Sequence, residues 1–141
     1  MEVGSIISLS LSGVSILAAI WSVFKTNKLT KTNHQSEIFT DCTRRYHDIM
    51  VSMPDVMVGN FGNIAPEVIK YMTLYYDLCS EEFHLHRQGD ITDEIWKNWE
   101  EGMRIMTRPE IYKTCWKFLS STYHKDFVHF MHHHIFNQTS K

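Results

Sequence analysis

Nine histidines stand among the 141 residues, and several of them are spaced with acidic residues as metal ligands are. Glu81 and His84 have the i, i+3 spacing that di-iron carboxylate bundles use. His129 and His133, four residues apart, would share one face of a helix. This pattern raises the hypothesis of a transition-metal site. Its preferred ligands are Glu82, His86, His129 and His133, with Glu81 and His84 as alternates because they fall off the main apolar stripe.

Glu82 and His86 lie inside the apolar stripe of a helix predicted over residues 66–88. A carboxyl group in such a stripe must be paired, protonated or placed at the edge of the core. His86, one turn further along, is the expected partner of Glu82, and Arg104 or Arg108 from a neighbouring helix is the alternative. A structural pair is the first interpretation, and a ligand or catalytic carboxylate with a shifted pKa is the second.

Motifs for other chemistry are missing from the sequence. There is no G-x-S-x-G, no glycine-rich phosphate loop and no C-x-x-C-H. Lysine plus arginine number 14 against 16 acidic residues, so no nucleic-acid partner is expected. We therefore expect a protein that is not an enzyme and has no cofactor, with the metal site as the alternative.

Three cysteines, Cys42, Cys79 and Cys115, lie far apart and form no C-x-x-C pair. An odd number of unpaired cysteines is typical of a reducing compartment. We expect each thiol to be a small buried apolar group.

The longest uncharged stretch covers residues 3–24. As a helix it would be about 33 Å long, enough to cross a hydrocarbon core of about 30 Å. Trp21, Lys25 and Lys28 at its end are typical anchors of the membrane interface. The sequence therefore predicts a transmembrane anchor over residues 1–25, with the lipid bilayer as a partner.

The charges around this stretch predict its orientation. Three lysines follow it and only Glu2 precedes it, so the positive-inside rule puts the N-terminus outside and the C-terminal domain in the cytoplasm. A cleaved signal peptide would need its positive charges before the apolar stretch. We therefore expect an uncleaved, single-pass anchor.

Small residues form a seam along this predicted membrane helix. Their steps of 3, 4, 3, 4 and 3 give a period of 3.5, which predicts a left-handed crossing with another helix. The alternative is that the serines bond back to their own helix. The first interpretation predicts association with a second copy or with another membrane protein. The seam consists of Ser5, Ser8, Ser12, Ser15, Ala19 and Ser22.

The rest of the chain predicts an all-α fold: one membrane helix followed by a small cytoplasmic bundle of about five helices. A polar connector is expected at 26–35, a helical domain at 36–136 and a frayed tail at 137–141. Helical spacing, prolines and caps divide the domain into helices that cover 36–53, 66–88, 92–108, 109–121 and 123–136. The segment 54–66 is expected to be a packed loop, with a hinge or binding loop as the alternative.

The second half of the chain contains the pattern YYDLCSEEFHLHRQGDITDEIWKNWEEGM, followed by RPEIYKTCWKF and YHKDFVHFM. With this pattern the chain resembles a group of small bacterial membrane-anchored proteins of unknown function. The resemblance covers about residues 75–136 and the N-terminal anchor. It implies a helical cytoplasmic domain on one membrane helix, and it implies no activity, cofactor or substrate.

These observations favour an interaction protein or accessory subunit that presents a helical module at the cytoplasmic face of a membrane. The alternatives are a membrane-tethered metal-binding protein and a defence effector that acts on the membrane.

Overall fold

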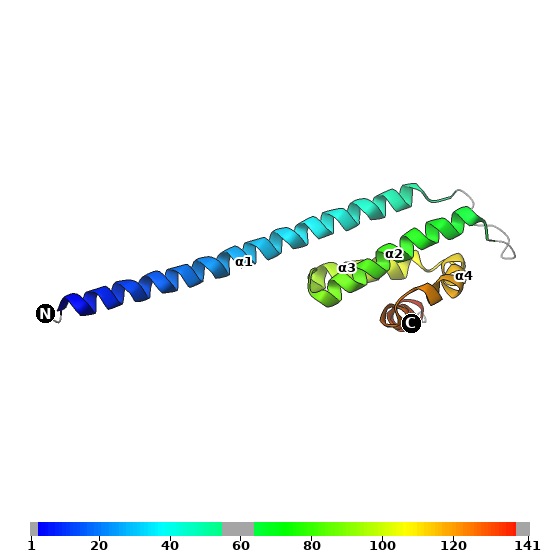
Figure 1. Ribbon diagram of the computed structural model, residues 1–141. Coiled ribbons are helices and arrows are strands. Elements are labelled where there is room, and N and C mark those ends of the chain that lie inside the picture. Colours follow the sequence, from blue (N-terminus) through cyan, green and yellow to red (C-terminus); the bar gives the residue numbers. More distant parts are fainter. Residues whose placement is uncertain (1–2, 55–63, 138–141) are drawn as a thin grey trace. The chain divides into compact units, whose positions relative to one another are not determined.

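In the part of the chain that the computed structural model describes, every regular element is a helix (Figure 1), which confirms the predicted all-α class. The structure describes the backbone of residues 3–54 and 64–137, and the side chains of 18–54 and 64–137. Most of the predicted loop 54–66 therefore lies outside the described residues. The helices are α1 (Val3–Val51), α2 (Pro66–Gln88), α3 (Asp93–Met106), α4 (Glu110–Leu119), the 3-10 helix η1 (Ser120–Thr122), α5 (Lys125–Phe130) and the π-helix η2 (Met131–Phe136).

The chain divides into two compact units, residues 1–36 and 37–141. The helix α1 runs without interruption through residue 36, from the first unit into the second, and ends at Val51. The predicted connector at 26–35 is thus helix, and the predicted helix start at Ser36 is wrong. The physical reason is that residues 26–35 contain no glycine or proline. The hydroxyls of Thr26 and Thr32 also donate to helix carbonyls one turn back, at 2.9 and 3.0 Å.

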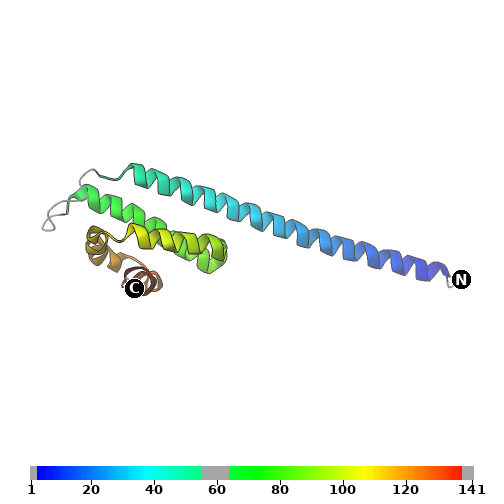
Figure 2. The same ribbon diagram turned by 180° about the vertical axis from the view of Figure 1, so that it is seen from behind.

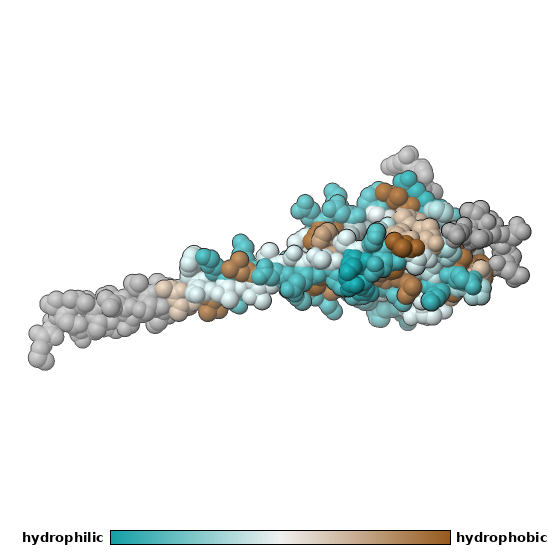
Figure 3. Space-filling model, turned by 90° about the horizontal axis from the view of Figure 1, so that it is seen from above, coloured by the Kyte–Doolittle hydropathy of each residue, from teal (hydrophilic) through white to brown (hydrophobic). Residues whose placement is uncertain are grey.

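Among the described residues, no helix combines the length and the apolar character that a membrane span requires. The side chains of residues 3–17, which make up most of the uncharged stretch, lie outside that description. Figure 3 shows hydrophobic surface where the described side chains of the first unit begin.

In the second unit, α2 is the helix around which the others pack. Its stripe of large apolar residues is buried as predicted, and Tyr76 is buried as well. Tyr76 extends the buried face because its ring packs on Trp116 of α4, with 4.8 Å between the centroids. Further along α2, Phe83 packs on Phe127 and Phe130 of α5, at 5.7 and 5.0 Å.

The ends of α2 and α3 follow their sequence signals closely. Pro66 opens α2, and Gly89 ends it in the left-handed conformation, with φ of 79°. The Thr92 hydroxyl accepts a hydrogen bond from the Ile95 N–H at 3.3 Å and so caps α3. Because the turn between the two helices is short, α3 returns alongside α2, as both views of the ribbon show (Figures 1 and 2).

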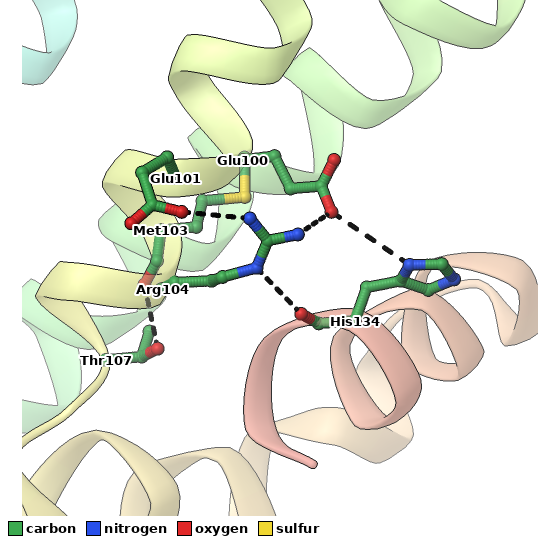
Figure 4. Close-up of polar contacts among 6 residues, drawn as sticks. All are labelled: Glu100, Glu101, Met103, Arg104, Thr107 and His134. Carbon is green, nitrogen blue, oxygen red and sulfur yellow. Dashed lines mark hydrogen bonds and ion pairs between the residues drawn. The ribbon is translucent and has the colours of Figure 1, made fainter. Parts of the chain in front are cut away.

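Arg104 links α3 to the C-terminal helix η2 (Figure 4). Its Nε donates to the carbonyl oxygen of His134 at 3.1 Å, and its other nitrogens pair with Glu100 and Glu101. One turn away, the hydroxyl of Thr107 donates to the carbonyl oxygen of Met103 at 2.8 Å. Arg104 is therefore engaged within α3 and η2 and is not the partner of Glu82.

Candidate site: an apolar cavity around Glu82

The second unit contains a mostly apolar cavity of about 380 Å³ between the C-terminal part of α1, α2 and α3. We call it the Glu82 cavity. Its volume falls within the range of small-molecule sites in proteins, about 300–1,000 Å³. Its lining includes the side chains of Phe39, Tyr46, Tyr75, Glu82 and Trp99 and the backbone of Gly102.

Aromatic side chains from all three helices line this cavity. Phe39 of α1 and Trp99 of α3 lie nearly parallel, with an interplanar angle of 9° and 6.1 Å between the ring centroids. Tyr46 and Tyr75 contribute further rings from α1 and α2. Phe39 and Tyr46 are 42% and 38% exposed, so the α1 side of the cavity faces solvent. The cavity is thus an aromatic-lined space that a ligand could enter.

Glu82 is the one carboxylic acid in this lining, and its side chain is only 7% exposed. The neighbouring Glu81 forms an ion pair with Arg45, whose Nη2 lies 2.7 Å from Glu81 Oε2. The second guanidinium nitrogen of Arg45 lies 3.7 Å from Asp41. Among the described residues, Glu82 therefore has neither a hydrogen bond nor an ion pair.

Burial raises the pKa of Glu82 to about 8, and the nearby charge of Glu81 acts in the same direction. Arg45 lowers this pKa, but by less. At neutral pH the carboxyl group is therefore mostly protonated, which is how a carboxylic acid persists in an apolar surrounding. The pKa of Glu82 is thus shifted, as the second sequence interpretation expects, while a ligand-binding or catalytic role of Glu82 stays a prediction.

The predicted pair between Glu82 and His86 does not form. His86 Nε2 lies 3.1 Å from Asp93 Oδ1 at the start of α3, and its ring stacks on Trp96 with 4.8 Å between the centroids. Helical spacing alone favours Glu82 as the partner of His86. The turn at Gly89, however, brings Asp93 and Trp96 of α3 back alongside His86. This is a tertiary contact that the wheel of one helix does not contain.

The other predicted metal ligands also have separate partners. The His84 ring packs on Phe83 and His124. His129 and His133 lie together, with 4.2 Å between their ring centroids, beside Ser120 and Ser121 in a shallow surface hollow. Within the described ranges, no group of three or more histidine, cysteine or acidic side chains is placed to hold a metal ion.

The predicted membrane-interface residues lie in the first unit. Trp21, Lys25 and Lys28 are exposed, and the Lys25 ammonium lies 5.3 Å from the centroid of the Trp21 ring. Ala19 and Ser22 of the predicted seam are exposed too. The seam residues Ser5, Ser8, Ser12 and Ser15 lie outside the residues whose side chains are described.

Comparisons with protein-family models, curated proteins and solved structures found no match. The resemblance to membrane-anchored bacterial proteins therefore stays an expectation.

Sequence reasoning identified Glu82 but missed the cavity around it. Phe39 and Trp99 each lie at helical spacing with other apolar residues, which predicts only an ordinary core face. At Gly102, a Cβ atom built on the backbone would meet nothing within 4 Å. The only signal of this space in the sequence is a residue without a side chain between bulky apolar ones, which also fits close packing.

Proposed function

We propose that the chain is a single-pass membrane protein that acts through interaction rather than catalysis. The helix anchors it with the N-terminus outside, and the second unit is presented at the cytoplasmic face. The seam of small residues associates with a second copy or with another membrane protein.

The observation that carries this proposal is the uncharged stretch 3–24, whose backbone is helical. Where its side chains are described, they are exposed: Ile20 is 47%, Trp21 67% and Phe24 70% exposed. Large apolar side chains on an isolated helix are unfavourable in water and favourable in lipid. The lysines that follow at once support the orientation.

Membrane fractionation tests the anchor. The full chain should stay in the membrane pellet after an alkaline carbonate wash. Replacing Leu11→Lys and Leu17→Lys together should release it, because each central lysine opposes insertion by about 2.5–3.5 kcal/mol. The matched control, Thr30→Lys with Asn33→Lys, adds the same charge beyond the stretch and should stay in the pellet. Release of the unaltered chain would overturn the anchor.

The native mass of the gently extracted chain tests the interaction. A complex several times heavier than 16.7 kDa that contains foreign subunits would identify an accessory subunit. A small homo-oligomer would assign the seam to a second copy. A monomer would overturn the interaction proposal and favour the effector alternative, for which growth of cells that express the chain is the assay.

A further inference from the structure

We propose that the Glu82 cavity binds an organic ammonium ion with an apolar body. The N–H groups of the ligand donate to the Glu82 carboxylate, and its hydrocarbon part fills the aromatic-lined space. The second unit alone carries this inference, so it does not depend on the membrane anchor.

The carboxyl group of Glu82 supplies the first argument. A side chain that is 7% exposed and has no hydrogen-bond partner among the described residues leaves strong acceptor positions unused. Glu82 lines an open cavity, and its carboxyl oxygens are not fully buried, so they can be reached from the cavity. Arg45, the nearest cation, is held by Glu81 and Asp41. The Glu82 carboxylate is therefore free to accept hydrogen bonds from a ligand that enters the cavity.

The aromatic lining indicates the charge of that ligand. Ring faces attract cations, and combinations of aromatic side chains are the usual recognition sites for alkylated ammonium groups. Phe39 and Trp99 stack with nearly parallel rings at one side of the cavity, and Tyr46 and Tyr75 add two more. A neutral ligand would use the apolar space, but only a cation uses the rings and the carboxylate together.

A metal ion fits this lining poorly. Besides Glu82, the lining includes two thiols, Cys42 and Cys79, and metals bind thiolates. Burial raises the pKa of Cys42 to about 11 and that of Cys79 well above its usual value, so both thiols keep their protons. The site thus offers one carboxylate and a large apolar volume, which suits an ammonium group on a hydrocarbon chain.

Binding should be coupled to release of a proton. The charged or titratable groups around Glu82 are Arg45, Cys42 and Tyr46 on α1 and Tyr75, Glu81 and Cys79 on α2; the α3 residues of the lining carry no charge. Because the pKa values of both thiols and of both tyrosines are raised, these groups keep their protons near pH 7. An alkylammonium ion keeps its charge there as lysine does, with a pKa of about 10.4. The proton released on binding therefore comes from Glu82.

The test is calorimetric titration of the full chain in maltoside micelles at pH 7. The probes are n-hexylammonium and the equally long, uncharged 1-hexanol. Hexylammonium should bind at least about tenfold more tightly than 1-hexanol, because its charged donors meet the carboxylate. Its binding enthalpy should differ between phosphate and Tris buffers, as release of close to one proton requires.

Variants assign the effect to Glu82. Glu82→Gln should lose about tenfold or more in affinity for hexylammonium, lose the buffer dependence and keep its affinity for 1-hexanol. Phe39→Leu, at a half-exposed ring, should weaken hexylammonium about fivefold. The control Glu94→Gln removes an exposed acid from the first turn of α3. It should change neither the affinity for hexylammonium nor the affinity for 1-hexanol.

Three results would overturn the proposal: equal affinity for the two probes, an unaltered hexylammonium affinity in Glu82→Gln, and binding of hexylammonium weaker than about 1 mM. Glu82→Gln keeps the shape of the side chain and removes a buried ionisable group, so loss of its fold is not expected. Retained binding of 1-hexanol checks that the cavity persists.

Discussion

Arg45 of α1 pairs with Glu81 of α2 at 2.7 Å and leaves the adjacent Glu82 without an ion pair. The two acids are sequence neighbours on one helix, so their side chains point about 100° apart. Glu81 faces the guanidinium at the surface, and Glu82 faces the cavity. The position on α2 thus buries Glu82 and exposes Glu81, and Arg45 pairs with the exposed acid.

Glu82 should make the stability of the protein fall as pH rises. Its folded pKa of about 8 lies above the usual value of 4.5, so between these values the folded state keeps a proton that the unfolded state releases. Stability contributed by the protonated group is complete below about pH 4.5 and is lost progressively up to about pH 8. Denaturant unfolding at pH 5 and pH 9 measures the loss.

The matched variant for this pH effect is Glu82→Gln, which stays neutral. Relative to it, the unaltered chain should lose a few kcal/mol of unfolding free energy between pH 5 and pH 9. Glu94→Gln, at an exposed position, should follow the unaltered chain. Parallel pH profiles for Glu82→Gln and the unaltered chain would mean that the carboxyl group is ionised in the folded protein.

The two described glycines of the second unit should respond in opposite directions to alanine. Gly102→Ala should stabilise the protein by about 1 kcal/mol, because it lies within α3 and the added methyl group meets nothing within 4 Å. Gly89→Ala should destabilise it by about 1–2 kcal/mol, since φ there is +79°. The denaturant midpoints of the two variants, each compared with that of the unaltered chain, measure these effects. Midpoint shifts of the same sign would contradict the geometry of one of the two positions.

Removal of the Arg104 side chain should loosen η2 more than the rest of the second unit. Arg104→Met loses the hydrogen bond to the His134 carbonyl and leaves Glu100, whose side chain is 17% exposed, without its arginine partner. We expect about 1–3 kcal/mol of destabilisation, and faster amide exchange in residues 131–136. Arg108→Met, at an exposed position, is the control. Equal effects of the two substitutions would exclude this role for Arg104.

The three cysteines should be nearly inert in the folded protein. Cys42, Cys79 and Cys115 are buried and unpaired, and burial raises the pKa of each thiol. Alkylation by iodoacetamide at pH 8 should therefore be slow until denaturant is added, because the thiolate is the reacting species. Mass spectrometry counts the modified residues. Rapid labelling of Cys42 in the native protein would indicate that α1 detaches from α2.

Association through the predicted membrane helix should depend on the seam and not on serine content. Ser12→Leu lies on the seam and should weaken energy transfer between labelled chains in vesicles. Ser10→Leu makes the same chemical change off the seam and should leave energy transfer unchanged. The triple variant Ser8→Leu, Ser12→Leu, Ser15→Leu should abolish it. Equal behaviour of the two single variants would remove the seam hypothesis.

The sequence by itself determined the helical class, the bounds of α2 and the core face of that helix. These features depend on local physics: helical periodicity of apolar residues, Pro66 at a helix start, Gly89 at its end and the Thr92 cap. It also marked Glu82 as an acid in an apolar stripe. The predicted break at 26–35 is wrong, since polar residues without glycine or proline continue a helix as readily as they end it.

Only the tertiary structure decided which partner each side chain takes. His86 and Asp93 meet because α3 folds back along α2, and Arg45 reaches Glu81 because α1 packs beside α2. Arg104 bonds a backbone carbonyl of η2, a contact that no spacing in the sequence encodes. The Glu82 cavity is likewise a feature of the tertiary structure. It exists because three helices, each with an ordinary apolar face, leave space between Phe39, Glu82 and Gly102.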